Sequence, residues 1–336
     1  MPSFCRHNRL ETTCPICSRK QREREREAAQ ARRPPRPARA GGTAPARRRA
    51  ASAGDVRVRR LARAGDDGFH SDLVPGLRSS ADARRLATEL AFAAARLGEL
   101  GGGSPPGLYG AARGAGGEEG LWLAFLIAYL GPLDDADDPF AEIARVRVPW
   151  ADGTVPQLEG TRVGPRGAWE PARHEDTLLA YRAWAARSGS QAAALAGEAS
   201  WTPERRFERA FERLALPGLT RAARYEFLLS AGALGLAALR PASLHLLADP
   251  RDPTVSAAKR VFGIGDVLLV QRRAAELAAA TALPIGALDL GLLNWARLTD
   301  DPDGSRIREG ATVGPDPDVV ELVEGALGVP AADEPG

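Results

Sequence analysis

Residues 252–297 read DPTVSAAKRVFGIGDVLLVQRRAAELAAATALPIGALDLGLLNWAR and carry the clearest structural pattern in the chain. Asp252-Pro253 is typical of a helix start, because aspartate accepts hydrogen bonds from free N–H groups and proline suits the first helical position. This helix should run to about Phe262, where Gly263-Ile264-Gly265 predicts a tight break. Asp266 can cap a second helix after the break. The stretch therefore predicts two helices joined by a paired-glycine corner.

The corner formed by Gly263, Ile264 and Gly265 has two interpretations. Glycine tolerates positive φ and has no Cβ, so a nucleic-acid backbone can approach closely, and the N–H groups that start the second helix can bind a phosphate. Asp266 opposes this interpretation, because its carboxylate repels a phosphate unless it turns away to cap the helix. The other interpretation is an ordinary helical corner.

Pro284 and Asp289 follow the corner by about twenty residues. In this respect the sequence resembles the helix-hairpin-helix DNA glycosylase superfamily, in which a Gly-hydrophobic-Gly hairpin precedes a catalytic aspartate. The resemblance implies that Gly263, Ile264 and Gly265 hold a DNA backbone and that Asp289 is catalytic. An Asp289→Asn substitution is then expected to abolish activity and leave the fold intact. The alternative role for Asp289 is a plain helix N-cap.

Four segments together extend the resemblance. They are residues 121–132, 221–229, 257–266 (AAKRVFGIGD) and 287–295 (ALDLGLLNW). The set is similar to one branch of that superfamily, the alpha-glutamyl/putrescinyl thymine pyrophosphorylases, which act on hypermodified thymine in DNA. The resemblance implies an aspartate that stabilises positive charge on a sugar or takes a proton from an attacking amine. The hairpin helix has no lysine and no cysteine follows Asp289, so neither a Schiff-base lyase nor an iron–sulfur cluster is expected.

Asn294 and Trp295 lie shortly after Asp289 and are candidates for contacting an extruded base, one by hydrogen bonding and the other by stacking. For Trp295, a place in the core is the alternative. Arg221 and Arg224 lie one helical turn apart and can grip a phosphate, with salt bridges to nearby carboxylates as the alternative.

The rest of residues 55–330 predicts a mainly α domain, because apolar residues recur with helical spacing. Gly98 can end a helix that carries Leu86, Leu90 and Leu97, and the apolar run 121–130 should lie in the core. Further expected features are a helix start at Thr202-Pro203, a last helix capped by Asp318, and a small ribbon of Val56–Val58 and Val146–Val148. The long loop 132–175 contains Trp150 and Trp169, which either stack on a base or, as we favour, pin the loop to the core.

All three cysteines of the chain, Cys5, Cys14 and Cys17, lie with His7 within its first 17 residues. Four such ligands at this spacing fit a tetrahedral structural zinc site, with the CPIC turn presenting two thiolates to one metal. A disulfide framework is disfavoured by the odd number of cysteines. The sequence therefore predicts a zinc-binding module over residues 1–20, whose metal stabilises the fold and performs no chemistry.

A basic segment follows the predicted module. Residues 18–63 contain 16 Lys and Arg against 4 acidic residues, while the whole chain has a net charge of only +2. Residues 21–54 are rich in Arg, Pro and Ala, which predicts a disordered basic linker, and 331–336 form a short tail. Such an arm favours a polyanionic partner, and DNA is the expected one. Without an apolar run near 20 residues, a membrane location is not expected, and the protein is expected to be cytoplasmic.

Three functional hypotheses follow. The first is a DNA-base-processing enzyme that cleaves an N-glycosidic bond or modifies a hypermodified thymine. The second is a non-catalytic nucleic-acid-binding or adaptor protein that uses the zinc module and the basic arm. The third is a helical domain without a nucleic-acid role, which the lack of a concave pocket near Asp289 would favour.

Overall fold

The computed structural model describes residues 65–249, 251–297 and 306–330. The chain divides into two units, residues 1–59 and 60–336, and all described residues belong to the second unit. The predicted zinc module with Cys5, His7, Cys14 and Cys17, the basic linker and the strand at Val56–Val58 lie outside the described residues.

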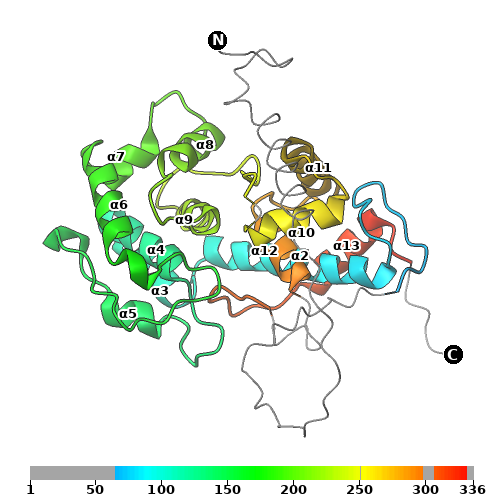
Figure 1. The fold of residues 1–336 in the computed structure, drawn as a ribbon, viewed down its shortest axis with the longest axis horizontal. Helices are drawn as coiled ribbons and strands as arrows, with labels where there is room; N and C mark the ends of the chain where they lie inside the picture. The colour runs from blue at the N-terminus through cyan, green and yellow to red at the C-terminus, as the bar shows by residue number, and fades with distance from the viewer. Residues whose placement is uncertain (1–64, 250, 298–305, 331–336) are drawn as a thin grey trace, which may run out of the picture. The chain divides into compact units, whose positions relative to one another are not determined.

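The described residues are mainly helical and contain no β-strand, which confirms the expected mainly α class (Figure 1). The α-helices are α2 (Ser80–Gly101), α3 (Gly107–Ala115), α4 (Gly117–Leu130), α5 (Ala141–Val146), α6 (Asp176–Ala186), α7 (Gln191–Ala196), α8 (Pro203–Arg213), α9 (Arg221–Ala233), α10 (Pro253–Phe262), α11 (Val267–Ala280), α12 (Ala287–Ala296) and α13 (Pro317–Leu327). Two short 3-10 helices, η1 (Trp150–Asp152) and η2 (Pro171–Arg173), interrupt the long segment between α5 and α6. The predicted ribbon strand at Val146–Val148 is wrong, because Val146 ends α5.

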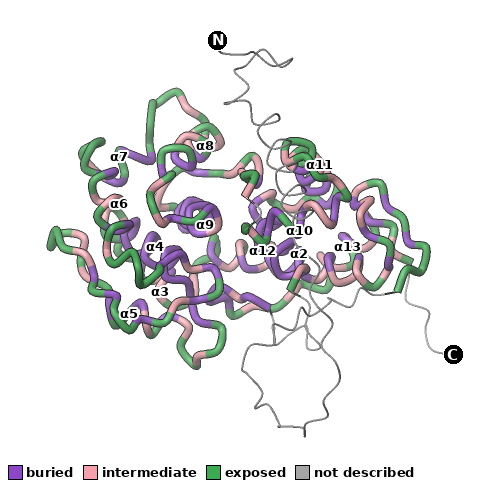
Figure 2. Tube along the Cα trace, viewed as in Figure 1, coloured by how far each residue is buried: buried purple, intermediate pink, exposed green. Residues whose placement is uncertain are grey.

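Helix α4 forms the centre of the core, as its uniformly apolar sequence predicts. Every residue from Gly120 to Leu130 is buried, and α4 packs against α3, α7 and α9 (Figure 2). Trp122 and Phe125 are stacked with ring centroids 5.8 Å apart, and Tyr181 of α6 stacks on Phe125 with centroids 3.7 Å apart. Phe227 of α9 meets Phe125 edge-on. These aromatic contacts hold α4, α6 and α9 together.

Two helices begin at the predicted N-cap residues, and the last helix begins two residues earlier than predicted. Thr202 caps α8 by accepting the N–H of Arg205, and Asp252 caps α10 by accepting the N–H groups of Thr254 and Val255. The last helix is capped by Asp316 rather than by Asp318, because Pro317 takes the first helical position and places Asp318 inside the first turn.

The helix, corner and helix predicted for residues 253–280 are present as α10 and α11. Gly263 adopts φ +64° and ends α10, and Asp266 accepts the N–H groups of Leu268 and Leu269 at the start of α11. A Cβ on Gly263 would lie 3.2 Å from the Cα of Gly76, so the first glycine of the corner packs closely against the chain before α2. Gly265 has open space around its Cα.

Helix α12, which carries Asp289, packs against α2 (Figure 1), and Asp289 is buried. The predicted end of α2 at Gly98 is wrong, because the helix continues to Gly101. Gly291 lies at the crossing, where an added Cβ would meet Leu90 Cδ2 at 2.8 Å and the backbone of Glu89 at 3.2 Å. Glycine at 291 therefore allows the two helix backbones to approach.

Gly291→Ala is expected to lower the free energy of unfolding by about 1–3 kcal/mol, because the added methyl group must displace the backbone of α2. Gly98→Ala is the matched control, since a Cβ on Gly98 meets nothing within 4 Å. That substitution should raise stability by about 0.5–1 kcal/mol through helix propensity. Urea denaturation of both variants measures the difference, and equal stabilities would contradict this description of the crossing.

Candidate functional site

Asp289 lies in the first turn of α12 with only 1% of its surface exposed. Its Oδ2 accepts a hydrogen bond from Nη2 of Arg166, and its Oδ1 lies 2.8 Å from Nη2 of Arg221 as an ion pair without hydrogen-bond geometry. The N-cap residue of α12 is Gly286, so Asp289 is not the plain N-cap of this helix. A buried carboxylate held by two guanidinium groups is instead part of an ionic network.

The network continues from both arginines. Arg166 Nη1 donates to Glu226 at 3.1 Å, and Arg96 donates to the same carboxylate from α2. Arg221, the first residue of α9, donates through Nε to Asp252 and through Nη1 to the carbonyl of Leu244 at 3.1 Å. This series of ion pairs and hydrogen bonds thereby joins α2, α9, α12 and the start of α10 to the loop that carries Arg166.

Glu309 is a third buried carboxylate beside Arg166, after Asp289 and Glu226. Its Oε1 lies 3.5 Å from Arg166 Nε and accepts no hydrogen bond among the described residues. Burial raises the pKa of Glu309 to about 7; Arg166 and Arg96 oppose this rise, while the carboxylates of Glu226 and Asp134 add to it. Its φ of +52° is uncommon for a residue with a Cβ, so Glu309 is held in a strained conformation.

Glu309→Gln is expected to change how stability depends on pH. A raised pKa means that the folded state holds its proton above the unfolded pKa near 4.5, so wild-type stability falls as the pH rises towards about 7. The variant avoids this loss, and at pH 8 it should be more stable than the wild type by up to about 3 kcal/mol, with little difference at pH 5.

The measurement is urea denaturation of wild type and variant at pH 5 and pH 8. Glu170→Gln removes a carboxylate whose side chain is 65% exposed, and it should shift stability equally at both pH values. A stability difference for Glu309→Gln that does not grow with pH would show that Glu309 is not protonated in the folded state.

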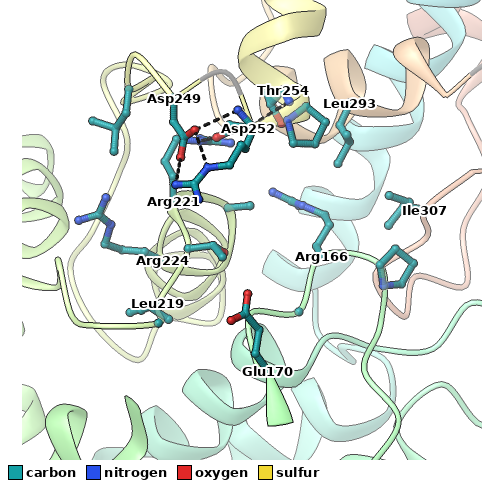
Figure 3. A pocket seen from close by; sticks show the side chains of 18 of the residues that line it. Arg166, Glu170, Leu219, Arg221, Arg224, Asp249, Asp252, Thr254, Leu293 and Ile307 are labelled. Carbon is teal, nitrogen blue, oxygen red and sulfur yellow. Dashed lines mark hydrogen bonds and ion pairs between the residues drawn. The ribbon is translucent and has the colours of Figure 1, made fainter. Parts of the chain in front are cut away.

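A pocket of about 660 Å³, here called the arginine pocket, lies beside this network (Figure 3). Six arginines line it together with three carboxylates: Arg166, Arg173, Arg221, Arg224, Arg251, Arg297, Glu170, Asp249 and Asp252. Asp289 does not line the pocket, because Arg166 and Arg221 lie between its carboxylate and the open space. Four of these arginines, Arg166, Arg173, Arg221 and Arg251, are paired with carboxylates on the pocket wall or behind it, whereas Arg224 forms no ion pair among the described residues.

The corner of Gly263, Ile264 and Gly265 does not line the arginine pocket. Asp252 and Thr254, at the start of α10, border the pocket, whereas the corner follows the end of the same helix. A helix of 10 residues is roughly 15 Å long, which separates the two features along α10. The structure thus keeps the corner and the pocket on one rigid element without joining them in one cleft.

Asn294 and Trp295 do not present their polar groups to a ligand. The Asn294 side chain bonds both the N–H and the carbonyl of Ile307, and the Trp295 indole N–H donates to the carbonyl of Asp82 at 3.0 Å. Both residues are buried. The expectation that they contact a base is therefore corrected: they fasten α12 to neighbouring segments, as the core alternative for Trp295 predicts.

The tryptophans of the long loop also serve packing. Trp169 is buried and its indole N–H donates to the carbonyl of His174, while Trp150 lies against the Trp122 ring with centroids 5.4 Å apart. These two contacts favour pinning of the loop to the core.

His245, outside this loop, stacks on Phe211, and burial lowers its pKa to about 4, with Arg224 and Arg221 adding to the effect.

Sequence reasoning identified Asp289, Arg221 and Arg224 but missed Arg96, Arg166, Glu226 and Glu309. One usable signal was Glu226 itself, a charge between Tyr225 and Phe227 in an otherwise apolar helix face. Arg166 stands in a Gly-Pro-Arg-Gly turn that shows no sign of burial. The salt-bridge alternative is confirmed for Arg221, whereas a phosphate contact by Arg221 or Arg224, which both line the pocket, stays a prediction.

Comparison with protein-family models, with curated proteins and with solved structures finds no match for this chain. Among the residues that the structure describes, no helix is both long and apolar enough to cross a membrane. The same residues contain no group of three or more His, Cys, Asp or Glu that could hold a metal ion.

Proposed function

We propose that this protein processes a base in DNA and that the arginine pocket is where the reaction takes place. The observation that carries the proposal is the position of Asp289, a buried carboxylate that fixes Arg166 and Arg221 at the wall of a pocket large enough for a base and its substituent. The resemblance of residues 257–266 and 287–295 to the glycosylase superfamily supports the same assignment.

The charge of the pocket favours one branch of that superfamily. Arg224, which lines the pocket without an ion pair among the described residues, and the N-terminus of α9 suit a substrate or leaving group that carries phosphate. Cleavage of an N-glycosidic bond instead builds positive charge on a sugar, which this lining would oppose. We therefore place the protein closer to the thymine pyrophosphorylase type, with modification of a hypermodified thymine as its reaction.

Asp289 acts in this proposal through the two arginines. Its carboxylate holds the guanidinium planes of Arg166 and Arg221 in place, which prepares the site for negative charge before the substrate arrives. A base must leave the helical stack to reach the pocket. A backbone held at Gly265 would lie roughly 15 Å away, which spans about four nucleotides of a DNA strand.

Nucleoside mass spectrometry of DNA from cells with and without the protein tests the proposal. A modified thymine that accumulates, disappears or changes its substituent when the protein is absent supports it. Identical nucleoside profiles, together with failure of the purified protein to alter that DNA, would contradict it.

A non-catalytic nucleic-acid-binding protein is the second candidate, and the 16 Lys and Arg within residues 18–63 favour it. Deletion of residues 18–63 should then remove most of the DNA affinity and most of its salt dependence. If the corner holds DNA, Gly265→Ala should weaken binding even without the arm. In both candidates we propose that Cys5, His7, Cys14 and Cys17 bind a structural zinc ion, which metal analysis of the purified protein tests.

A further inference from the structure

Residues 306–313, here called the strap, form part of the arginine pocket without belonging to a helix. Ile307 lines the pocket, and Figure 3 shows it on the side of the pocket that carries Arg166. A helical wall is held by its own backbone hydrogen bonds, whereas the strap contains a single turn and no helix. Its position therefore depends on contacts with other parts of the fold.

Helices α2 and α12 hold the first residues of the strap. Arg306 pairs with Glu89 of α2 at 2.8 Å. The Asn294 side chain of α12 bonds both the N–H and the carbonyl of Ile307, at 3.0 and 3.1 Å. Ile307 therefore stays at the pocket wall only while the strap lies against these two helices.

Two further backbone N–H groups of the strap are bonded to carboxylates elsewhere in the fold. The N–H of Arg308 donates to Asp134 at 3.0 Å, and the N–H of Thr312 donates to Glu99 of α2 at 3.2 Å. Both acceptors lie outside the strap, so both bonds are lost when the strap moves away. Together with the N–H of Ile307, these amides indicate whether the strap is seated.

Glu309 lies between these contacts and brings a surplus carboxylate to the buried network. Without it the network contains three cations and three carboxylates, namely Arg96, Arg166, Arg221, Asp252, Glu226 and Asp289. An ionised Glu309 adds a fourth carboxylate, and its Oε1 accepts no hydrogen bond within the described part of the chain. A buried charge in this situation costs free energy, which the carboxylate recovers when it reaches water.

The titratable groups that face Glu309 come from α2, α3, α9 and two loops; they are Arg96, Tyr109, Glu226, Asp134 and Arg166. Tyr109 is neutral, because burial raises its pKa. Both arginines are already paired with other carboxylates. Burial raises the pKa of Glu309 to about 7, and repulsion by Glu226 and Asp134 adds to the rise, so the carboxyl changes its charge near neutral pH.

We propose that the strap is a proton-controlled wall of the arginine pocket: protonated Glu309 keeps it seated, and loss of this proton favours release of the strap, and of Ile307 with it, from the pocket. Release also frees the backbone of Glu309 from a φ of +52°, which residues with a Cβ rarely adopt. Access to the pocket then depends on pH, whatever reaction takes place there.

Hydrogen–deuterium exchange of the full-length protein at pH 6 and pH 8, with rates corrected for the intrinsic effect of pH, tests the proposal. The amides of Ile307, Arg308 and Thr312 should open about tenfold more often at pH 8 than at pH 6. The reason is that the carboxyl of Glu309 titrates near 7 in the seated strap and near 4.5 in water. Glu309→Gln cannot ionise and should abolish this difference.

Glu99→Gln is the matched control, because it weakens the contact with Thr312 and leaves Glu309 intact. This variant should increase the exchange of the strap at both pH values. The tenfold difference between pH 6 and pH 8 should remain, since the titrating carboxyl is still present.

A peptide from α4, residues 121–130, separates release of the strap from unfolding of the whole protein, because every residue in it is buried. Its amides should exchange more slowly than those of the strap at both pH values. Strap amides that open equally at pH 6 and pH 8 would overturn the proposal. So would a pH difference that persists in Glu309→Gln, or strap amides that exchange at the same rate as those of α4.

Discussion

Asp289→Asn is expected to abolish base processing and to lower the free energy of unfolding by about 3–5 kcal/mol. Asparagine has nearly the shape of aspartate but carries no charge. It therefore cannot neutralise Arg166 and Arg221, which are both buried and both paired with the Asp289 carboxylate in the wild type. The resemblance to glycosylases led us to expect an unchanged fold in this variant. That expectation is incompatible with the burial of the whole ion-pair cluster.

Two measurements are needed for Asp289→Asn, namely urea denaturation and the product assay on modified DNA, performed at a temperature where the variant is still folded. Asp249→Asn is the matched control, because Asp249 lines the same pocket but pairs with Arg251 in the solvent. The control should stay close to wild-type stability. A stable Asp289→Asn protein, or a folded one with full activity, would refute the role given to Asp289.

Arg166→Met is expected to lower the free energy of unfolding by about 3–5 kcal/mol at pH 7.5, because three buried carboxylates lose one shared cation. Burial alone would raise the pKa of the Glu226 carboxyl, but Arg96 and Arg166 hold this pKa below its ordinary value. Without Arg166 this pKa rises, and the folded state takes up protons that the unfolded state does not hold. The deficit relative to wild type should therefore shrink as the pH falls from 7.5 to 5.

The double variant Arg166→Met/Glu309→Gln provides the control for this prediction. Removal of the Glu309 carboxylate relieves part of the repulsion, so the double variant should be more stable than Arg166→Met at pH 7.5. The gain in stability from Glu309→Gln should be larger in Arg166→Met than in wild type. An equal gain in both backgrounds would show that Arg166 and Glu309 are not coupled and would contradict this part of the network.

The helices were predictable from the sequence because their signals are local. The Asp252-Pro253 start, the glycine at 263 and the Asp266 cap all lie within a few residues of the structure they specify. Helix ends were less predictable: Gly98 continues α2 because nothing nearby requires a left-handed residue there, and the helix ends three residues later.

The candidate site was predictable only in part, because its contacts join distant segments. Arg166 and Asp289 are 123 residues apart in the chain, and Arg96 and Glu226 are 130 residues apart. The spacing of residues within a short segment does not predict pairs that are so far apart in the sequence. The resemblance to the glycosylase superfamily pointed to Asp289. Its contact with Arg166 and Arg221, and hence its separation from the pocket surface, follows from the packing of α12 against α2 and α10.

Arginine is the cation throughout the buried network, and a guanidinium group does not give up its proton in the physiological range. Protons are therefore exchanged only by the acids, and Glu309 is the acid closest to doing so near neutrality. Acidification consequently removes negative charge from the network as Glu309 takes up its proton, whereas on the alkaline side Arg224, whose pKa burial and Arg221 lower to about 10, is the cation of the pocket that loses its proton. The buried network therefore carries less negative charge behind the arginine pocket at mildly acidic pH than at pH 8.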